Sequence, residues 1–110
     1  MAHYLVQLSY TPEAWASQLK EPRNRVEIVR PALESVGARF ESTYMAFGEY
    51  DLIFIMEAPD NVSAAAVSLA VTSGGAVKSY KTTPLMTIDE GIQAMRKGAD
   101  VAKIYQPPAR

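Results

Sequence analysis

The chain has no cysteine among its 110 residues, which excludes disulfides, thiolate metal ligands and a cysteine nucleophile. It has a single histidine, His3, so a multi-histidine metal site within one chain is excluded as well. A lone histidine could serve as an axial haem ligand, as in some α+β barrel proteins. We favour a surface position for His3 at the start of a strand, and we predict neither a metal nor a cofactor.

An excess of one charge and a long hydrophobic run are also missing. Lys and Arg number 11, Asp and Glu number 12, and the net charge is −1, so we predict no binding to nucleic acid or to an anionic membrane. The longest weakly polar run, VSAAAVSLAV, is too short to cross a bilayer. The first residues lack the charged and apolar regions of a signal peptide. We therefore expect a cytoplasmic protein with one globular domain.

The chain does have a regular order of strand and helix patterns. Thr11 and Pro12 have the residue types that begin a helix, and Pro22 interrupts that helix. Pro31 lies within its second part and predicts a kink or an early break. Gly37 and Gly98 each predict the end of a helix. We predict strands at 3–10, 38–47, 50–58 and 76–85, helices at 12–36, 60–73 and 87–98, and a tail at 105–110.

This order is β-α-β-β-α-β, which predicts an α+β fold of the ferredoxin-like type. Right-handed crossovers place both main helices on one face of a four-stranded antiparallel sheet. The first and third strands then occupy the centre of that sheet.

The third strand is apolar on both of its sides. Leu52, Phe54 and Met56 share one side with Tyr50, and the other side carries two isoleucines between two carboxylates. One layer of helices covers only one face of a sheet, so Ile53 and Ile55 need another cover. A second copy of the chain would provide it and would form a dimeric α+β barrel with a cavity between two sheets. The alternative is that the C-terminal segment, with Val101, Ile104 and Tyr105, folds back over this face.

The segment FGEYD, with Gly48, Tyr50 and Asp51, carries a family resemblance. It precedes an apolar strand, EAPDN, an alanine-rich helix and a Gly-Gly stop. With the earlier YTPE and PRNR segments, this order resembles the GYD domain family over residues 3–97. Arg25 resembles the arginine that begins the family's long first helix. Pro31 and the residues after Lys97 depart from the family pattern, so we divide the chain into a domain at 1–97 and an extension at 98–110.

The resemblance implies a dimeric α+β barrel fold and names no substrate. The family is largely uncharacterised in function. The Gly-x-Tyr-Asp segment is also similar to a hairpin in the effector domains of leucine-responsive (Lrp/AsnC) regulators, where it lies near a dimer interface that receives small ligands. This second likeness concerns fold and loop alone.

Asp51 is the best candidate for a catalytic or ligand-binding group. Its carboxylate could point into a cavity between two chains, where it would bind a cation or act as a base. In the alternative that we favour, Asp51 accepts backbone N–H bonds that hold the hairpin, while Gly48 supplies a positive φ. Glu57 lies on the same side but about 20 Å further along the strand. For Glu57 we favour a salt bridge at an interface or rim.

Several tyrosines and basic residues could line a ligand cavity. Tyr4 and Tyr50 are our first choices beside Asp51, because tyrosines can orient an aromatic or enolisable ligand. Lys78 and Tyr80 share a strand and suit a carboxylate or phenolate, and Arg25 could also bind an anion. The alternative interpretations are core tyrosines and a solvated edge strand protected by lysine.

The sequence thus favours a homo-oligomer that binds a small, partly apolar organic molecule in a cavity between sheets. One alternative is a cofactor-independent isomerase or monooxygenase that acts on an activated aromatic compound or a lactone. Another is a structural oligomer without a ligand. These alternatives differ in whether a cavity lies beside Asp51 and whether that carboxylate is free to react.

Overall fold

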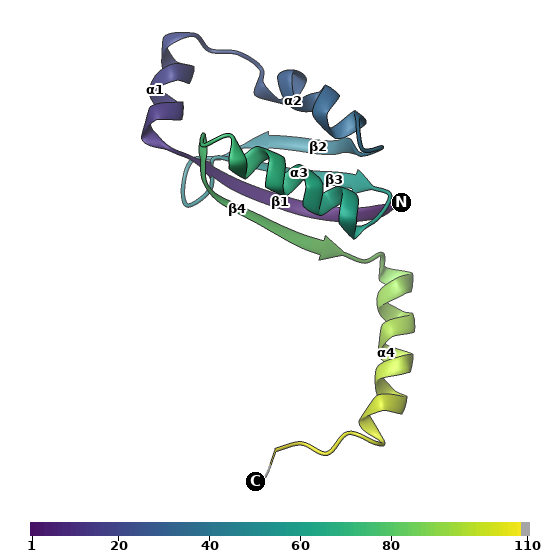
Figure 1. Ribbon diagram of the computed structural model, residues 1–110. Coiled ribbons are helices and arrows are strands. Elements are labelled where there is room, and N and C mark those ends of the chain that lie inside the picture. Colours follow the sequence, from purple (N-terminus) through teal and green to yellow (C-terminus); the bar gives the residue numbers. More distant parts are fainter. Residues whose placement is uncertain (109–110) are drawn as a thin grey trace.

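A computed structural model of the chain describes residues 1–108. Its four strands are β1 (Ala2–Tyr10), β2 (Arg39–Met45), β3 (Leu52–Ala58) and β4 (Val77–Leu85). They form one antiparallel sheet in the order β2-β3-β1-β4 (Figure 1). The predicted α+β ferredoxin-like fold is confirmed, with the first and third strands in the centre.

The first helical segment consists of two helices, α1 (Pro12–Lys20) and α2 (Arg25–Glu34). Thr11 caps α1, as predicted, because its side chain accepts a hydrogen bond from the amide of Ala14 at 3.1 Å. Asn24 caps α2 in the same way, with its side chain bonded to the amide of Val26 at 3.1 Å. Pro31 does not break α2, which continues for three residues beyond it and ends at Glu34, before the predicted Val36.

Helix α3 (Asn61–Ser73) returns across the sheet, and α4 (Ile88–Ala102) follows β4. The side chain of Asp60 caps α3 by accepting a hydrogen bond from the amide of Ser63 at 2.8 Å. The predicted end of α4 at Gly98 is wrong, because this helix continues to Ala102. An exposed glycine within a helix costs only about 1 kcal/mol, and the good helix formers around Gly98 outweigh that cost.

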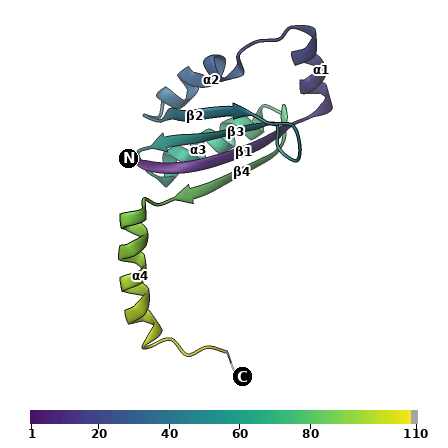
Figure 2. The same cartoon turned by 180° about the vertical axis from the view of Figure 1, so that it is seen from behind.

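Helix α4 points away from the sheet, and no other element lies beside it (Figures 1 and 2). Val101, Ile104 and Tyr105 are exposed at 62%, 83% and 61%. The alternative in which this segment folds back over the sheet is therefore wrong. Residues 109 and 110 of the predicted tail lie outside the described residues. None of the described helices is both long and apolar enough to cross a membrane.

The hydrophobic core lies between the sheet and the helices α2 and α3. Val6 and Leu8 of β1 and Met56 of β3 are buried there together with Leu33 of α2 and Val67 of α3. The predicted alternation of β1 and β3 is confirmed, because their even-numbered residues face the helices. Burial of these side chains supplies the main driving force for folding.

None of the described helices covers the other face of the sheet (Figure 2). Leu5, Ile53 and Ile55 lie on this face and are only half-buried. Tyr44, which pairs with Ile53, is 70% exposed. The sheet is thus apolar on both faces, as the pattern of the third strand predicts. We call these four residues the uncovered face.

Candidate functional site

Two cavities adjoin on the helix side of the sheet. The first has a volume of about 460 Å³ and lies between α1, the start of α2 and the hairpin end of the sheet. Its size falls in the range of small-molecule sites, about 300–1,000 Å³. Side chains of mixed character line it, mainly apolar and aromatic with a few polar groups: Tyr10, Trp15, Leu19, Arg25, Val26, Met45, Asp51 and Leu52 among others.

Asp51 holds the wall of the first cavity together. Its Oδ2 accepts a hydrogen bond from the amide of Tyr10 at 2.9 Å and another from Nε1 of Trp15 at 3.1 Å. Its own amide donates to the carbonyl oxygen of Leu8 at 2.8 Å. The carboxylate therefore connects the end of β1, helix α1 and the start of β3. The expected acceptance of a backbone N–H is present, but the donor belongs to β1 rather than to the hairpin.

The link between β2 and β3 differs from the expected tight turn. Gly48 has no positive φ, and the described glycines with positive φ are Gly37 and Gly75. Six residues, 46–51, separate the two strands. A loop of this length can reverse the chain without a residue in the left-handed region, so the expectation for Gly48 is wrong.

Asp51 faces the helices and not the uncovered face of the sheet. The expectation assumed that strand alternation extends from Ile53 back to Asp51, but β3 begins at Leu52. Asp51 lies in the loop, where its side chain turns toward Trp15 of α1. A cavity does lie beside Asp51, but it is between the helices and the sheet of one chain and is not the predicted cavity between two chains.

Arg25 and Tyr10 lie where the two cavities meet, because both residues line both cavities. Burial raises the pKa of Tyr10, the nearby Arg25 opposes this shift, and Asp51 adds to it. The ring of Tyr10 also packs edge-to-face on Trp15, with centroids 5.4 Å apart. Within residues 1–108, Arg25 has no carboxylate oxygen within 4.0 Å.

The second cavity, of about 290 Å³, extends from Arg25 between α2 and α3 toward β4. Its walls are mostly apolar and include Val29, Phe54 and Val71. Tyr80 of β4 also lines it, and its hydroxyl oxygen is buried without a hydrogen-bond partner among the described residues. Burial raises the pKa of Tyr80 to about 12, so this hydroxyl keeps its proton at any physiological pH.

The structure separates the other predicted site residues from these cavities. Tyr4 is buried under the helices, where its hydroxyl donates to Oδ1 of Asn61 at 2.6 Å. It therefore faces away from the uncovered face, where we expected a cavity. Lys78 is exposed beside the register shift of β4, and Tyr50 lies in the loop before β3. None of the three lines either cavity.

Sequence reasoning overlooked Trp15 as a site residue. We interpreted it as one residue of an apolar helix face, whereas its indole N–H is bonded to Asp51. The available signal was its position just after the Thr11-Pro12 helix start, which places it near the end of β1. No spacing rule connects it to Asp51, which is 36 residues away.

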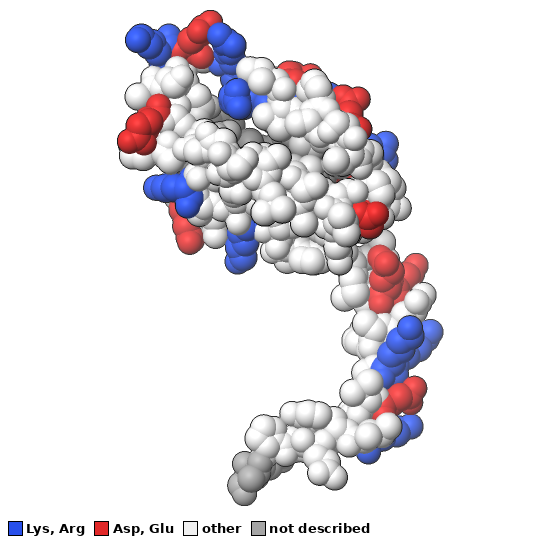
Figure 3. All heavy atoms as spheres, in the orientation of Figure 1, with Lys and Arg blue, Asp and Glu red and all other residues white. Residues whose placement is uncertain are grey.

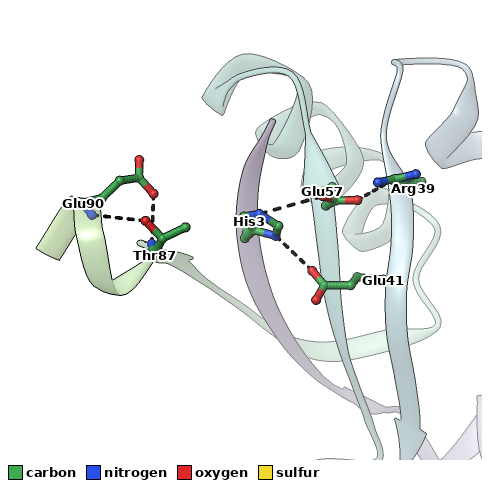
Figure 4. Close-up of polar contacts among 6 residues, drawn as sticks. All are labelled: His3, Arg39, Glu41, Glu57, Thr87 and Glu90. Atoms are coloured by element: carbon green, nitrogen blue, oxygen red, sulfur yellow. Dashed lines mark hydrogen bonds and ion pairs between the residues drawn. The ribbon is translucent and has the colours of Figure 1, made fainter.

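A separate group of charged side chains lies at the end of the sheet that is far from the 46–51 loop (Figure 4). His3 contacts Glu41 through Nδ1 at 2.9 Å and Glu57 through Nε2 at 3.8 Å, and Arg39 pairs with Glu57. The hydrogen bond from Arg39 is the main cause that lowers the pKa of Glu57. The salt bridge expected for Glu57 is therefore present. Ligand atoms of His3, Glu41 and Glu57 lie within 4.8 Å of one another, but Arg39 already neutralises Glu57.

The charges elsewhere are dispersed. On the face that Figure 3 shows, basic and acidic side chains alternate without a continuous patch of one sign. This distribution agrees with the near-zero net charge. Arg25 lines the first cavity together with Arg23.

Comparisons with known proteins give a family and a fold. The model of the family described as GYD domain matches residues 4–95. A comparison with curated proteins gave no match. Among solved structures, TTHA0845 from Thermus thermophilus is 17% identical with a TM-score of 0.52, and the match covers 79% of this chain and 95% of that chain.

Two further structures resemble the chain to a similar degree. FFRP-DM1 is 14% identical with a TM-score of 0.51, over 78% of this chain and 100% of that one. MtbAldR is 13% identical with a TM-score of 0.53, over 78% of this chain and 52% of that one. At these identities the likeness concerns the fold alone.

Proposed function

This chain belongs to the GYD domain family, and on that premise we propose that it is a self-associating module that binds a small, partly apolar organic molecule. The ligand site is the first cavity, beside Asp51, Trp15 and Arg25. This placement differs from the cavity between two sheets that the sequence favoured. The observation that carries the proposal is a space of about 460 Å³ with a mainly apolar and aromatic wall, in which Asp51 and the indole N–H of Trp15 are held together by a hydrogen bond.

The composition of the cavity suits recognition of a small molecule. Trp15 and Leu52 offer apolar contact area, and Arg25 offers a cation with no carboxylate partner among the described residues. Asp51 is held by two N–H donors. A rigid apolar wall with a few oriented polar groups is the usual form of a small-molecule site.

Self-association is supported by the uncovered face. Ile53, Ile55 and Leu5 are contiguous on β3 and β1, and no element within residues 1–108 covers them. A second copy that packs its own uncovered face against this one would remove apolar surface from water on both sides. The resulting arrangement is a dimeric α+β barrel with the ligand sites on its outer, helix-covered sides.

The enzyme alternative receives less support. Asp51 is the only carboxylate among the described residues that line either cavity. Its Oδ2 is engaged by the two N–H donors of Tyr10 and Trp15, which makes it part of the scaffold. No second carboxylate and no histidine lines these cavities within residues 1–108, so a two-carboxylate or histidine-based mechanism has no second group here.

A thermal-shift screen of small organic acids, amines and neutral compounds tests the binding function. Val26 lines both cavities, so Val26→Phe should fill the site. Ile28 lies on the same helix, is 45% exposed and lines neither cavity, so Ile28→Phe is the matched control. Ligands should raise the melting temperature of the natural chain and of the control, but not of Val26→Phe. A screen without any stabilising compound would favour the structural oligomer.

A further inference from the structure

The buried hydroxyl of Tyr80 has no hydrogen-bond partner among residues 1–108. It lies on the helix side of β4, opposite Leu8, at the wall of the second cavity. Every other buried side-chain nitrogen or oxygen in the described part of the chain has a partner. The hydroxyl oxygen is closed to water, so an acceptor from outside the chain reaches it only when neighbouring side chains move. A buried donor without an acceptor is unfavourable, so such an acceptor would then be held firmly.

Water is a poor occupant of this position. A buried water needs about two to four polar partners. Apolar side chains surround Tyr80 in the second cavity, among them Val29, Val71 and Val77. A molecule that is mostly apolar and carries one acceptor oxygen fits these walls better than a group of waters does.

Arg25 provides the second recognition group. It lies where the two cavities meet and has no carboxylate oxygen within 4.0 Å among the described residues. Asp51 lines only the first cavity, so an anion in the first cavity beside Asp51 is repelled. An anionic group is best placed at Arg25 with the rest of the ligand in the second cavity.

We propose that the ligand is an elongated organic carboxylate whose apolar chain carries one hydrogen-bond acceptor. Its carboxylate pairs with Arg25, its chain lies between α2 and α3, and its acceptor receives the hydrogen bond of the Tyr80 hydroxyl. The proposal rests on the proposed binding function and places the chain of this ligand in the second cavity, which meets the first at Arg25. Arg25 sets the preference for charge, and Tyr80 sets the preference for the position of the acceptor.

Calorimetric titration with octanoate, octanol and octyltrimethylammonium tests the preference for charge. The three probes have the same chain and differ in the charge of the head group. Octanoate should bind at least about tenfold more tightly than the other two, and Arg25→Gln should remove that difference. Arg23→Gln is the matched control, because Arg23 also lines the first cavity but already pairs with Glu21 at 3.0 Å.

A series of oxo-octanoates, with the ketone at successive carbons, tests the role of Tyr80. One isomer should bind about fivefold more tightly than octanoate, and Tyr80→Phe should abolish this gain. Octanoate itself has no acceptor in its chain, so it should bind Tyr80→Phe at least as well as the natural protein. This comparison separates a lost hydrogen bond from a damaged cavity.

Two results would overturn the proposal. Equal affinity for the three head groups, or a preference that survives Arg25→Gln, would contradict the pairing of a ligand carboxylate with Arg25. If no ketone isomer binds more tightly than octanoate in a way that depends on Tyr80, the ligand has no acceptor at this position. Tyr80 would then be a core residue. With either result, probe binding that Val26→Phe abolishes would still support the proposed function. If no probe binds at all, the proposed function and this inference are both contradicted.

Discussion

Nε1 of Trp15 donates a hydrogen bond of 3.1 Å to Oδ2 of Asp51, and this bond joins helix α1 to the loop before β3. Both residues line the first cavity. The same oxygen also accepts the amide of Tyr10. One carboxylate thereby fixes the wall of the first cavity, and the family signature that contains Asp51 has a structural role in that wall.

Trp15→Phe should lower the free energy of unfolding by about 1 kcal/mol, because it keeps an aromatic ring and removes the N–H donor. Asp51→Asn should cost about 1–3 kcal/mol, because the amide of Tyr10 loses a charged acceptor. Urea denaturation of both variants and of the double variant measures their coupling. Additive losses would show that the two side chains do not interact in solution. Glu49→Gln, a nearby change that leaves these bonds intact, is the control.

Tyr4→Phe and Tyr80→Phe should have opposite effects on the protein without ligand. Tyr4→Phe removes a hydrogen bond of 2.6 Å and leaves Asn61 without that donor, so stability should fall by about 1 kcal/mol. Tyr80→Phe removes a hydroxyl that has no partner among the described residues, so stability should stay equal or rise. Both changes delete one oxygen from a tyrosine that faces the helices. A similar loss in both variants would mean that Tyr80 has a partner in solution.

Acidification should weaken the ion pair of Glu57 and Arg39. The pKa of Glu57 in the folded chain lies below its ordinary value of 4.5, mainly because Arg39 donates a hydrogen bond to it. The unfolded chain thus takes up this proton first as the pH falls. The ion pair therefore stabilises the folded chain above pH 4.5. This contribution is lost as the pH falls from 4.5 toward the lower pKa that Glu57 has in the folded chain.

Arg39→Gln should therefore reduce stability near neutral pH and make the loss of stability below pH 4.5 less steep. Urea midpoints measured across the acid range provide the test. Lys103→Gln is the control, because its ion pair with Asp100 is exposed at 3.6 Å and the slope should not change. An Arg39→Gln variant with the slope of the natural protein would mean that the pair is open in solution.

Ile55→Lys should dissociate the proposed oligomer, since it places a charge in the middle of the uncovered face. Sedimentation equilibrium should show an association constant at least about tenfold weaker than that of the natural chain. Ile28→Lys makes the same change on the exposed surface of α2 and should leave the association constant unchanged. A natural chain that sediments as a single protomer at all concentrations would contradict self-association.

Removal of residues 98–110 should leave the free energy of unfolding of the domain within about 0.5 kcal/mol of its original value. No residue of α4 is buried, and the helix lies away from the sheet (Figure 1). Surface changes away from packed features have effects of this size. Urea denaturation of the shortened chain below the concentration of self-association tests the prediction. A large loss would contradict the division into a domain at 1–97 and an extension.

The sequence predicted the site less completely than the fold. Asp51 and Tyr80 were named, and both line a cavity. Tyr4 was assigned to the wrong environment, although its place on the strand was right. Strand alternation assigns a residue to a face, but only packing tells which face holds a cavity. Trp15 was overlooked because its bond to Asp51 spans 36 residues and needs the fold to form.

The amino-acid sequence by itself determined the order of strands and helices, the cap of α1 at Thr11, and the two apolar faces of β3. These features depend on local periodicity and on side chains within three or four residues of the backbone groups that they bind. Tertiary structure alone decided that the Asp51 loop turns toward the helices and that Arg25 lies between two cavities. It also decided the direction of α4. These placements depend on contacts between distant segments, whose geometry no local pattern specifies.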